Sequence, residues 1–233
     1  MLKLGGVSNL HAGIPTVDNV MRVLPILLLC ASTSLAAQAS PTENNSIPLT
    51  TMQRLLQEDQ NDLPGHGTSA TSFDEQQYNA RAEARKQQVR SMLTNGDLRT
   101  GEDFYDAAII FQHGGTADDY LFAHVLAMDA IVKGYDTAKW IAAASLDRYL
   151  QIVHQPQVFG TQYPLDPNKP HPVTPAGRFK GRTQQPYDDT LLPDSLRTDF
   201  CVASQDQQKQ VLAFMDTGKR PPGALMVAPG CNR

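Results

Sequence analysis

The sequence predicts an all-α fold, either a small antiparallel helical bundle or a helical-repeat-like layer, with a long proline-rich loop segment. Three observations predict it. Helix-start motifs, and glycines where helices should end, divide much of residues 73–217 into helices. Inside these stretches, apolar residues recur with helical spacing. Prolines and glycines crowd residues 156–198, where a helix cannot continue.

The first 39 residues are typical of a secretory signal and not of a folded element. Met21 and Arg22 precede a short apolar run, residues 23–31, and small residues follow as far as Ala39. The run is shorter than the roughly 20 residues needed to span a bilayer. We therefore expect a true start at Met21, and cleavage after Ala39 in preference to a lipid anchor on Cys30. The product would be an exported protein, periplasmic or secreted, without a further membrane span.

Residues 40–72 are polar, and we expect a flexible lead-in with a short helix at 51–58, followed by one helical domain over 73–233. Side chains that can cap helix N-termini mark the starts. They are Ser72, Thr100, Thr116 and Ser204, with a weaker start at Asp136. The helices expected from these starts cover residues 73–95, 101–113, 117–133, 137–154 and 205–217.

The apolar residues of the middle helices predict which faces are buried. Short links join the second, third and fourth helices, so these should pack as antiparallel neighbours. The buried stripe expected on the second helix is Phe104, Ala107, Ala108 and Phe111. The stripe expected on the third helix is Leu121, Val125, Met128 and Val132. Residues 140–149 of the fourth helix are apolar nearly all round, which predicts the central helix, and Ala144 ends a run of small residues that allows close packing.

Two features concern the C-terminal half. The loop segment 156–198 is too long to serve only as a connection between helices, and loops of this length are usually functional or disordered. Removal of the signal would leave two cysteines, Cys201 and Cys231. Neither has a nearby Cys or His, so a disulfide is favoured over a metal pair or a reactive thiol.

The charge of the chain argues against one class of partner. The net charge is −4, and the sequence has no basic run that would follow a phosphate backbone. Nucleic acid is therefore not expected as a partner.

A segmented pattern in residues 103–163, about a quarter of the chain, resembles an uncharacterised family of bacterial domains of unknown function. The pattern consists of a Gln-His, a Leu-Asp-Arg and a Phe-Gly-Thr-Gln motif, here Gln112-His113, Leu146-Asp147-Arg148 and Phe159-Gly160-Thr161-Gln162. This resemblance implies no activity. The first helix of the pattern is also similar to a tetratricopeptide-type helix, although the Trp and Leu-Gly signature of that repeat is missing.

Four side chains are candidates for chemistry: His113, His124, Asp147 and Arg148. His113 ends a helix, where a cation is favoured, so it can serve as a capping donor. His124 lies on the expected apolar stripe, where a histidine is more often a core residue than a ligand. Asp147 and Arg148 lie on the most apolar helix, and each needs a partner because an unpaired buried charge is costly. Either histidine could pair with Asp147, and Asp166 could pair with Arg148.

The same residues allow two interpretations. The favoured one is a buried polar network that pins the loop to the helices. The other is a His-Asp general base that activates water in a cleft. The residues expected to bind a ligand there are Gln112, Gln157, Thr161, Gln162 and Tyr163. The sequence has neither a Gly-x-Ser-x-Gly nor a His-Glu-x-x-His motif, and the histidines lack the spacing of a helical metal pair, so no metal or cofactor is expected.

Three functional classes remain, in this order. The first is an exported helical interaction or scaffold module that uses the proline-rich loop as its contact surface for an unknown protein or small molecule. The second is a small hydrolase that uses a His-Asp pair. The third is a metal-binding periplasmic protein.

Overall fold

The computed structural model describes residues 49–63, 74–170 and 179–231, which all belong to one unit, Ile47–Arg233. In these ranges the fold is all-α, and pairing between extended segments is limited to isolated bridges. The helices are α1 (Thr51–Asp62), α2 (Glu75–Asn95), α3 (Gly101–Gln112), α4 (Ala117–Val132), α5 (Lys139–Ile152), α6 (Asp194–Asp199) and α7 (Gln205–Asp216), with the 3-10 turns η1 (Asp136–Ala138) and η3 (Gly223–Leu225). None of the helices described is long and apolar enough to cross a membrane. The predicted signal, residues 1–39, lies outside the described residues.

Several helix starts follow from side-chain capping. Thr100 begins α3 and Ser204 begins α7 in reciprocal capping boxes, as the sequence predicts, and Thr50 begins α1 in the same way. Ser72, the predicted cap of α2, lies outside the described residues, and α2 begins at Glu75 instead. The side chain of Asp74 accepts from the backbone N–H of Gln77 and caps the helix two residues later.

The other two starts differ in detail. Thr116 begins α4 as predicted, and its hydroxyl accepts from the backbone N–H of Asp119. Asp136 opens the 3-10 turn η1 and not the α-helix. Helix α5 begins at Lys139 without a side-chain cap, directly after that turn.

Residues 51–62 are helical, although they belong to the segment expected to be a flexible lead-in. They form α1, which includes the short helix predicted at 51–58 and extends it by about one turn. Met52 and Leu55 are almost fully buried and join the same core as Val89 of α2. The segment is ordered because its apolar residues fall on one helical face, which the core covers.

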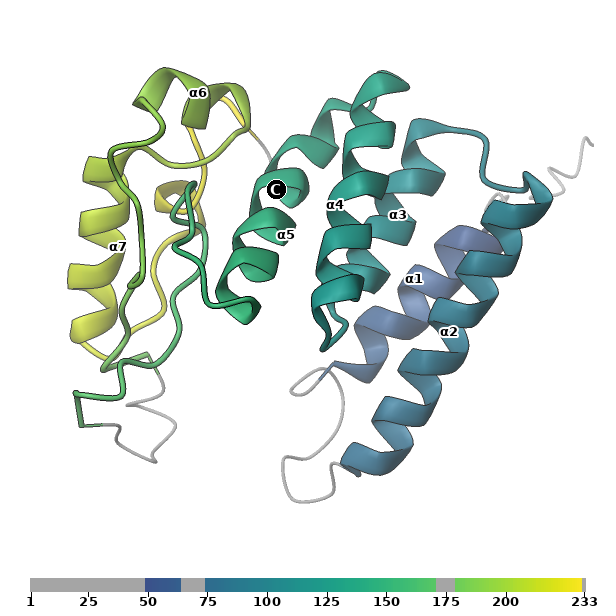
Figure 1. Ribbon diagram of the computed structural model, residues 1–233, viewed down its shortest axis with the longest axis horizontal. Helices are drawn as coiled ribbons and strands as arrows, with labels where there is room; N and C mark the ends of the chain where they lie inside the picture. The colour runs from purple at the N-terminus through teal and green to yellow at the C-terminus, as the bar shows by residue number, and fades with distance from the viewer. Residues whose placement is uncertain (1–48, 64–73, 171–178, 232–233) are drawn as a thin grey trace, which may run out of the picture. The chain divides into compact units, whose positions relative to one another are not determined.

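Helices α3, α4 and α5 pack side by side in sequence order, and Figure 1 shows α1 and α2 next to α3. Links of a few residues join α3 to α4 and α4 to α5, so neighbours run antiparallel, as predicted. The predicted buried face of α3 is confirmed: Phe104, Ala107, Ala108 and Phe111 are all buried.

The predicted buried face of α4 is wrong. Val125 is 53% exposed and Val132 is 80% exposed, and Leu121 and Met128 are also exposed. The face that packs carries Ala123, Leu126, Ala127 and Ala130. Helix α4 has two apolar faces, and periodicity cannot choose between them. The face with small side chains lies inside because it lets α3 and α5 approach closely.

Helix α5 separates two parts of the core. Ala142 belongs to the cluster formed by α1 to α4, whereas Ala143 packs with Phe159 and Val202 from the C-terminal half. This position agrees with the predicted central helix. The predicted disulfide between Cys201 and Cys231 is present.

The segment 156–198 is largely irregular, as predicted, in the residues described. The segment is nevertheless held together by backbone pairing, because isolated bridges join Gln157 to Tyr187 and Leu165 to Arg182. Its last residues form the short helix α6, which the sequence analysis missed. Residues 171–178 of this segment lie outside the described part of the chain.

Candidate functional site

Asp147 of α5 fixes the turn that follows the helix. Its carboxylate accepts from the backbone N–H groups of Val158 (2.9 Å), Phe159 (3.0 Å) and Thr161 (2.9 Å), and from the Thr161 hydroxyl (2.7 Å). The side chain is fully buried. Burial raises the pKa of Asp147, and the donors of Phe159, Thr161 and Val158 oppose that rise. These four donors account for the position of an acid on the most apolar helix.

The turn has little freedom to move. Gly160 has a φ of +79°, and a Cβ at this position would collide with the side chains of Gln208 and Tyr187. The Gln157 side chain closes the turn, because its Oε1 accepts from the backbone N–H of Gln162 at 3.0 Å and its Nε2 donates to the Gln162 carbonyl at 3.1 Å. Gln162 therefore leaves the turn in a defined direction.

Gln162 connects the turn to Arg148. Its amide donates to the Thr161 hydroxyl at 2.9 Å and to the Ala144 carbonyl at 3.3 Å, while its Oε1 accepts from Arg148 Nε at 3.0 Å. Arg148 Nη1 donates to the Gln112 carbonyl at 2.6 Å. Among the described residues no hydrogen bond involves Arg148 Nη2, so the guanidinium keeps donors for a ligand.

A second guanidinium lies on the other side of Tyr163. Arg182 pairs through its backbone with the segment after Tyr163, because Leu165 bridges to Arg182 and the Thr183 N–H donates to the Pro164 carbonyl. The Arg182 side chain reaches back, and its Nη1 donates to the Tyr163 carbonyl at 2.8 Å.

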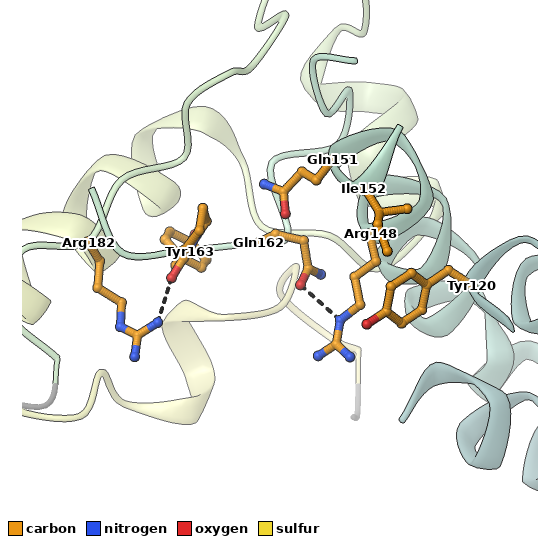
Figure 2. A pocket seen from close by; sticks show the side chains of 8 residues that line it. Tyr120, Arg148, Gln151, Ile152, Gln162, Tyr163 and Arg182 are labelled. Atoms are coloured by element: carbon orange, nitrogen blue, oxygen red, sulfur yellow. Dashed lines mark hydrogen bonds between the residues drawn. The ribbon is translucent and has the colours of Figure 1, made fainter. Parts of the chain in front are cut away.

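Residues of α4, α5 and the loop segment line a hollow of about 430 Å³ that is open to solvent. We call it the arginine pocket, and it is lined by Tyr120, Arg148, Gln151, Ile152, Gln162, Tyr163, Pro164 and Arg182. Figure 2 shows the two guanidinium groups on either side of Gln162 and Tyr163. No lining residue is acidic, so the pocket has a local excess of positive charge although the whole chain is acidic.

Apolar and amide groups complete the pocket. The ring of Tyr120 lies beside the guanidinium of Arg148, at 5.7 Å from ring centroid to Cζ. Within the described part of the chain, the buried Nε2 of Gln151 has no hydrogen-bond partner. The pocket therefore combines charged donors and an unused amide N–H with an aromatic and aliphatic wall.

The predicted site residues fall into two groups. Arg148, Gln162 and Tyr163 line the arginine pocket. Gln157 and Thr161 are buried in the turn beneath it, and Gln112 is buried and contributes its carbonyl to Arg148. The last three residues therefore shape the site and do not line it.

The expected pairing of a histidine with Asp147 is wrong, because the turn occupies the carboxylate. His124 Nδ1 donates to the Ala142 carbonyl at 2.8 Å and links α4 to α5. His113 lies 2.6 Å, Nδ1 to Oδ2, from Asp59 of α1. The expected pair of Arg148 with Asp166 is also wrong, since Asp166 instead accepts from the Asn168 N–H.

His113, which pairs with Asp59, lines a smaller hollow of about 190 Å³. Asp59 is almost fully buried, with Arg85 Nη2 at 3.6 Å from its other oxygen. Lys86 Nζ and Asp119 Oδ2 form an ion pair at 2.9 Å on the wall of the same hollow. Burial is the largest single influence and raises the pKa of Asp119, but the hydrogen bonds from Lys86, Thr116 and Gly115 and the charge of Lys86 together outweigh it, so that pKa is lowered.

Sequence reasoning missed five of the eight residues that line the arginine pocket, and three of these five have polar side chains. Gln151 could have been found, because it lies three residues after Arg148 and so shares its helical face. Tyr120 and Arg182 carry no such signal, since they reach the pocket from a different helix and from a distant loop.

His113, His124 and Asp147 do not come together, because each has a separate partner. In the described ranges no group of three or more His, Cys, Asp or Glu side chains could hold a metal ion. Comparison of the chain with protein-family models, with curated proteins and with solved structures found no match.

Proposed function

We propose that the chain is an exported helical binding module that holds the carboxylate group of a ligand in the arginine pocket. The observation that carries this proposal is that Arg148 and Arg182 line one hollow to which no acidic side chain contributes. Guanidinium groups bind carboxylates through paired N–H donors. The pocket lies between α5 and the loop segment 156–198, which is the expected contact surface.

The wall of the pocket favours a carboxylate attached to an apolar or aromatic body. Ile152, Pro164 and the rings of Tyr120 and Tyr163 provide apolar area, and Gln151 offers an amide N–H. The hollow is open, and it suits a small ligand or the end of a longer chain. A single small acid should bind weakly, with a dissociation constant on the order of 1 mM, given the few atoms that it can bring into contact.

Titration with three probes tests the proposal. We expect 4-hydroxyphenylacetate to shift the Nε–H NMR signals of Arg148 and Arg182. Its neutral amide should not do so, and inorganic phosphate should do so only at higher concentration. Binding of the acid should be lost in Arg182→Gln and Arg148→Gln and kept in Arg54→Gln, whose arginine is exposed and pairs with Glu58. Equal shifts from the acid and the amide would refute the proposal.

Export is part of the proposal. The Cys201–Cys231 disulfide supports it, because such bonds persist in oxidising compartments. The signal-like residues 21–39 support it independently. Intact mass of the protein recovered from outside the cytoplasm should correspond to a chain that starts near Ser40 without added lipid. A mass that corresponds to an acylated Cys30 would contradict this part.

A second candidate function is hydrolysis with His113 as general base. The 2.6 Å contact of Nδ1 with the buried Asp59 favours it, because a carboxylate at Nδ1 orients the ring and leaves Nε2 to take a proton from water. In the described residues no hydrogen bond involves that Nε2.

Ester hydrolysis by matched histidine variants tests this candidate. His113→Asn keeps an N–H donor for Asp59 but removes the base, so turnover of p-nitrophenyl acetate should fall by about 100-fold or more, while folding is retained. His154→Asn changes an exposed histidine on α5's C-terminal side and should leave turnover unchanged. Equal turnover in the wild type and His113→Asn would exclude this function.

A further inference from the structure

The outward face of α4 carries an apolar stripe that nothing in the described structure covers. We call it the outer stripe, and it consists of Leu121, Val125, Met128 and Val132. Of the nine large hydrophobic side chains that are exposed in the described ranges, these four lie on one helix. Helix α4 is thus apolar on both faces, which is typical of a helix that is covered on both sides.

The spacing of the outer stripe is that of a coiled-coil seam. Its members are separated by four, three and four residues, which is the alternation of d and a positions in two heptads. The spacing reads the same in both directions along the helix. An antiparallel copy of α4 therefore places Leu121 opposite Val132 and Val125 opposite Met128, so every member meets an apolar partner.

A preformed hollow matches this arrangement. It measures about 350 Å³ and is lined by Arg90, Asp118, Leu121, Phe122 and Val125. The four residues from α4 in that set have the spacing i, i+3, i+4 and i+7, which forms the hole that receives a knob in coiled-coil packing. Under the antiparallel pairing, the side chain opposite this hole is Val132 of the other copy, which is 80% exposed.

The charges beside the outer stripe are complementary under the same pairing. Arg90 lies over the Phe122 ring, 4.6 Å from Cζ to the centroid, and rims the hollow with Asp118. Asp129 and Lys133 flank Val132 on the same side of α4, because each residue turns the helix by about 100°. The two-fold arrangement brings Asp129 of one copy near Arg90 of the other, and Lys133 near Asp118. Each contact joins opposite charges and occurs twice.

We propose that two copies of this chain associate through α4 in an antiparallel, two-fold symmetric pair, with Val132 of each copy in the hollow of the other. A two-fold interface is self-complementary, as the palindromic spacing and the exchanged charges require. The pair buries one helix face per copy, which is less than a standard interface, so its dissociation constant falls in the range of roughly 10–500 µM. This association is independent of the arginine pocket.

Sedimentation velocity of the full chain over a concentration series from about 5 µM to 1 mM tests the proposal. The wild type should show a monomer–dimer equilibrium. Val132→Glu should weaken it by about tenfold or more, because it places a carboxylate in an apolar hole. Leu191→Glu, at an exposed apolar residue outside α4, should leave it unchanged. Circular dichroism verifies that both variants fold.

Charge reversal tests the register. Arg90→Glu faces Asp129 of the other copy and should weaken association, and Asp129→Lys should do the same against Arg90. The double variant, with both changes in one chain, restores opposite charges and should recover most of the lost affinity. A chain that stays monomeric up to about 1 mM overturns the proposal. So does a dimer that Val132→Glu leaves intact, or a double variant that is weaker than both single variants.

Discussion

The Asp147 carboxylate accepts both the backbone N–H and the hydroxyl of Thr161, at 2.9 and 2.7 Å, fourteen residues further along the chain. The next residue, Gln162, holds Arg148 in the arginine pocket. Two adjacent residues of α5 thus have different roles. Asp147 shapes the turn from inside, and Arg148 faces the pocket that the turn completes.

Asp147→Asn should therefore destabilise the protein. The amide keeps one oxygen but turns an N–H₂ group toward buried donors, which leaves at least one of them unpaired. The expected loss in the free energy of unfolding is about 2–4 kcal/mol. Urea denaturation measures it, and Asp216→Asn, at an exposed acid near the end of α7, is the matched control. Equal losses in the two variants would mean that Asp147 does not hold the turn.

Ala144→Leu should also destabilise the fold. Ala144 has no exposed surface on α5, and its carbonyl accepts from Gln162. A larger side chain must push neighbouring elements apart, which typically costs about 1–3 kcal/mol. The melting temperature measures the effect. Ala84→Leu, at an exposed position of α2, should leave the melting temperature almost unchanged, and a similar value for Ala144→Leu would show that α5 is not closely packed.

The sequence was sufficient where local rules decide the structure. Thr100 and Ser204 start their helices because their hydroxyls pair with nearby backbone N–H groups. Phe104 and Phe111 lie inside because helical spacing places them on one apolar stripe of α3. Gly160 makes the turn after α5, and its positive φ is a local requirement that glycine meets without strain.

The sequence was insufficient where distant segments choose between alternatives. Helix α4 has two apolar faces, and only the close approach of α3 and α5 decides that Ala123 and Ala127 face inward. Asp59 and His113 are 54 residues apart, and their pairing depends on where α1 docks. Arg182 reaches the arginine pocket from the loop, and no spacing pattern relates it to Arg148.

Reduction of the Cys201–Cys231 bond should lower stability and change the C-terminal half first. The bond closes a loop with a sequence separation of 30 residues, which contains α7. In the chain-entropy view such a crosslink stabilises by roughly 3 kcal/mol. Paired Cys201→Ser and Cys231→Ser changes should reproduce the loss in urea denaturation. Labelling of the denatured, unreduced protein should find no free thiol at either position, and two labelled thiols would contradict the bond.

Asp106 of α3 has an unusual environment that gives a pH dependence. It is 4% exposed, and burial, with Glu102 and Asp103 nearby, raises the pKa of Asp106 from 3.8 to about 7. The folded state therefore binds this proton more tightly than the unfolded state does. Between pH about 4 and about 7 the unfolded chain holds fewer protons at this group, so stability falls as the pH rises.

Asp106→Asn should remove that loss, because asparagine is neutral at every pH. At pH 4 the folded wild type carries a neutral carboxylic acid, and the two proteins should be about equally stable. At pH 8 the variant should be more stable by up to about 4 kcal/mol, since one unit of pKa is worth about 1.4 kcal/mol. Urea denaturation across this range measures the difference between the two proteins, in which the contributions of other titrating groups cancel. Asp97→Asn, at an exposed acid, is the control and should give no such trend. If the stability difference between Asp106→Asn and the wild type does not grow with pH, then Asp106 is ionised in the folded protein like an ordinary surface acid.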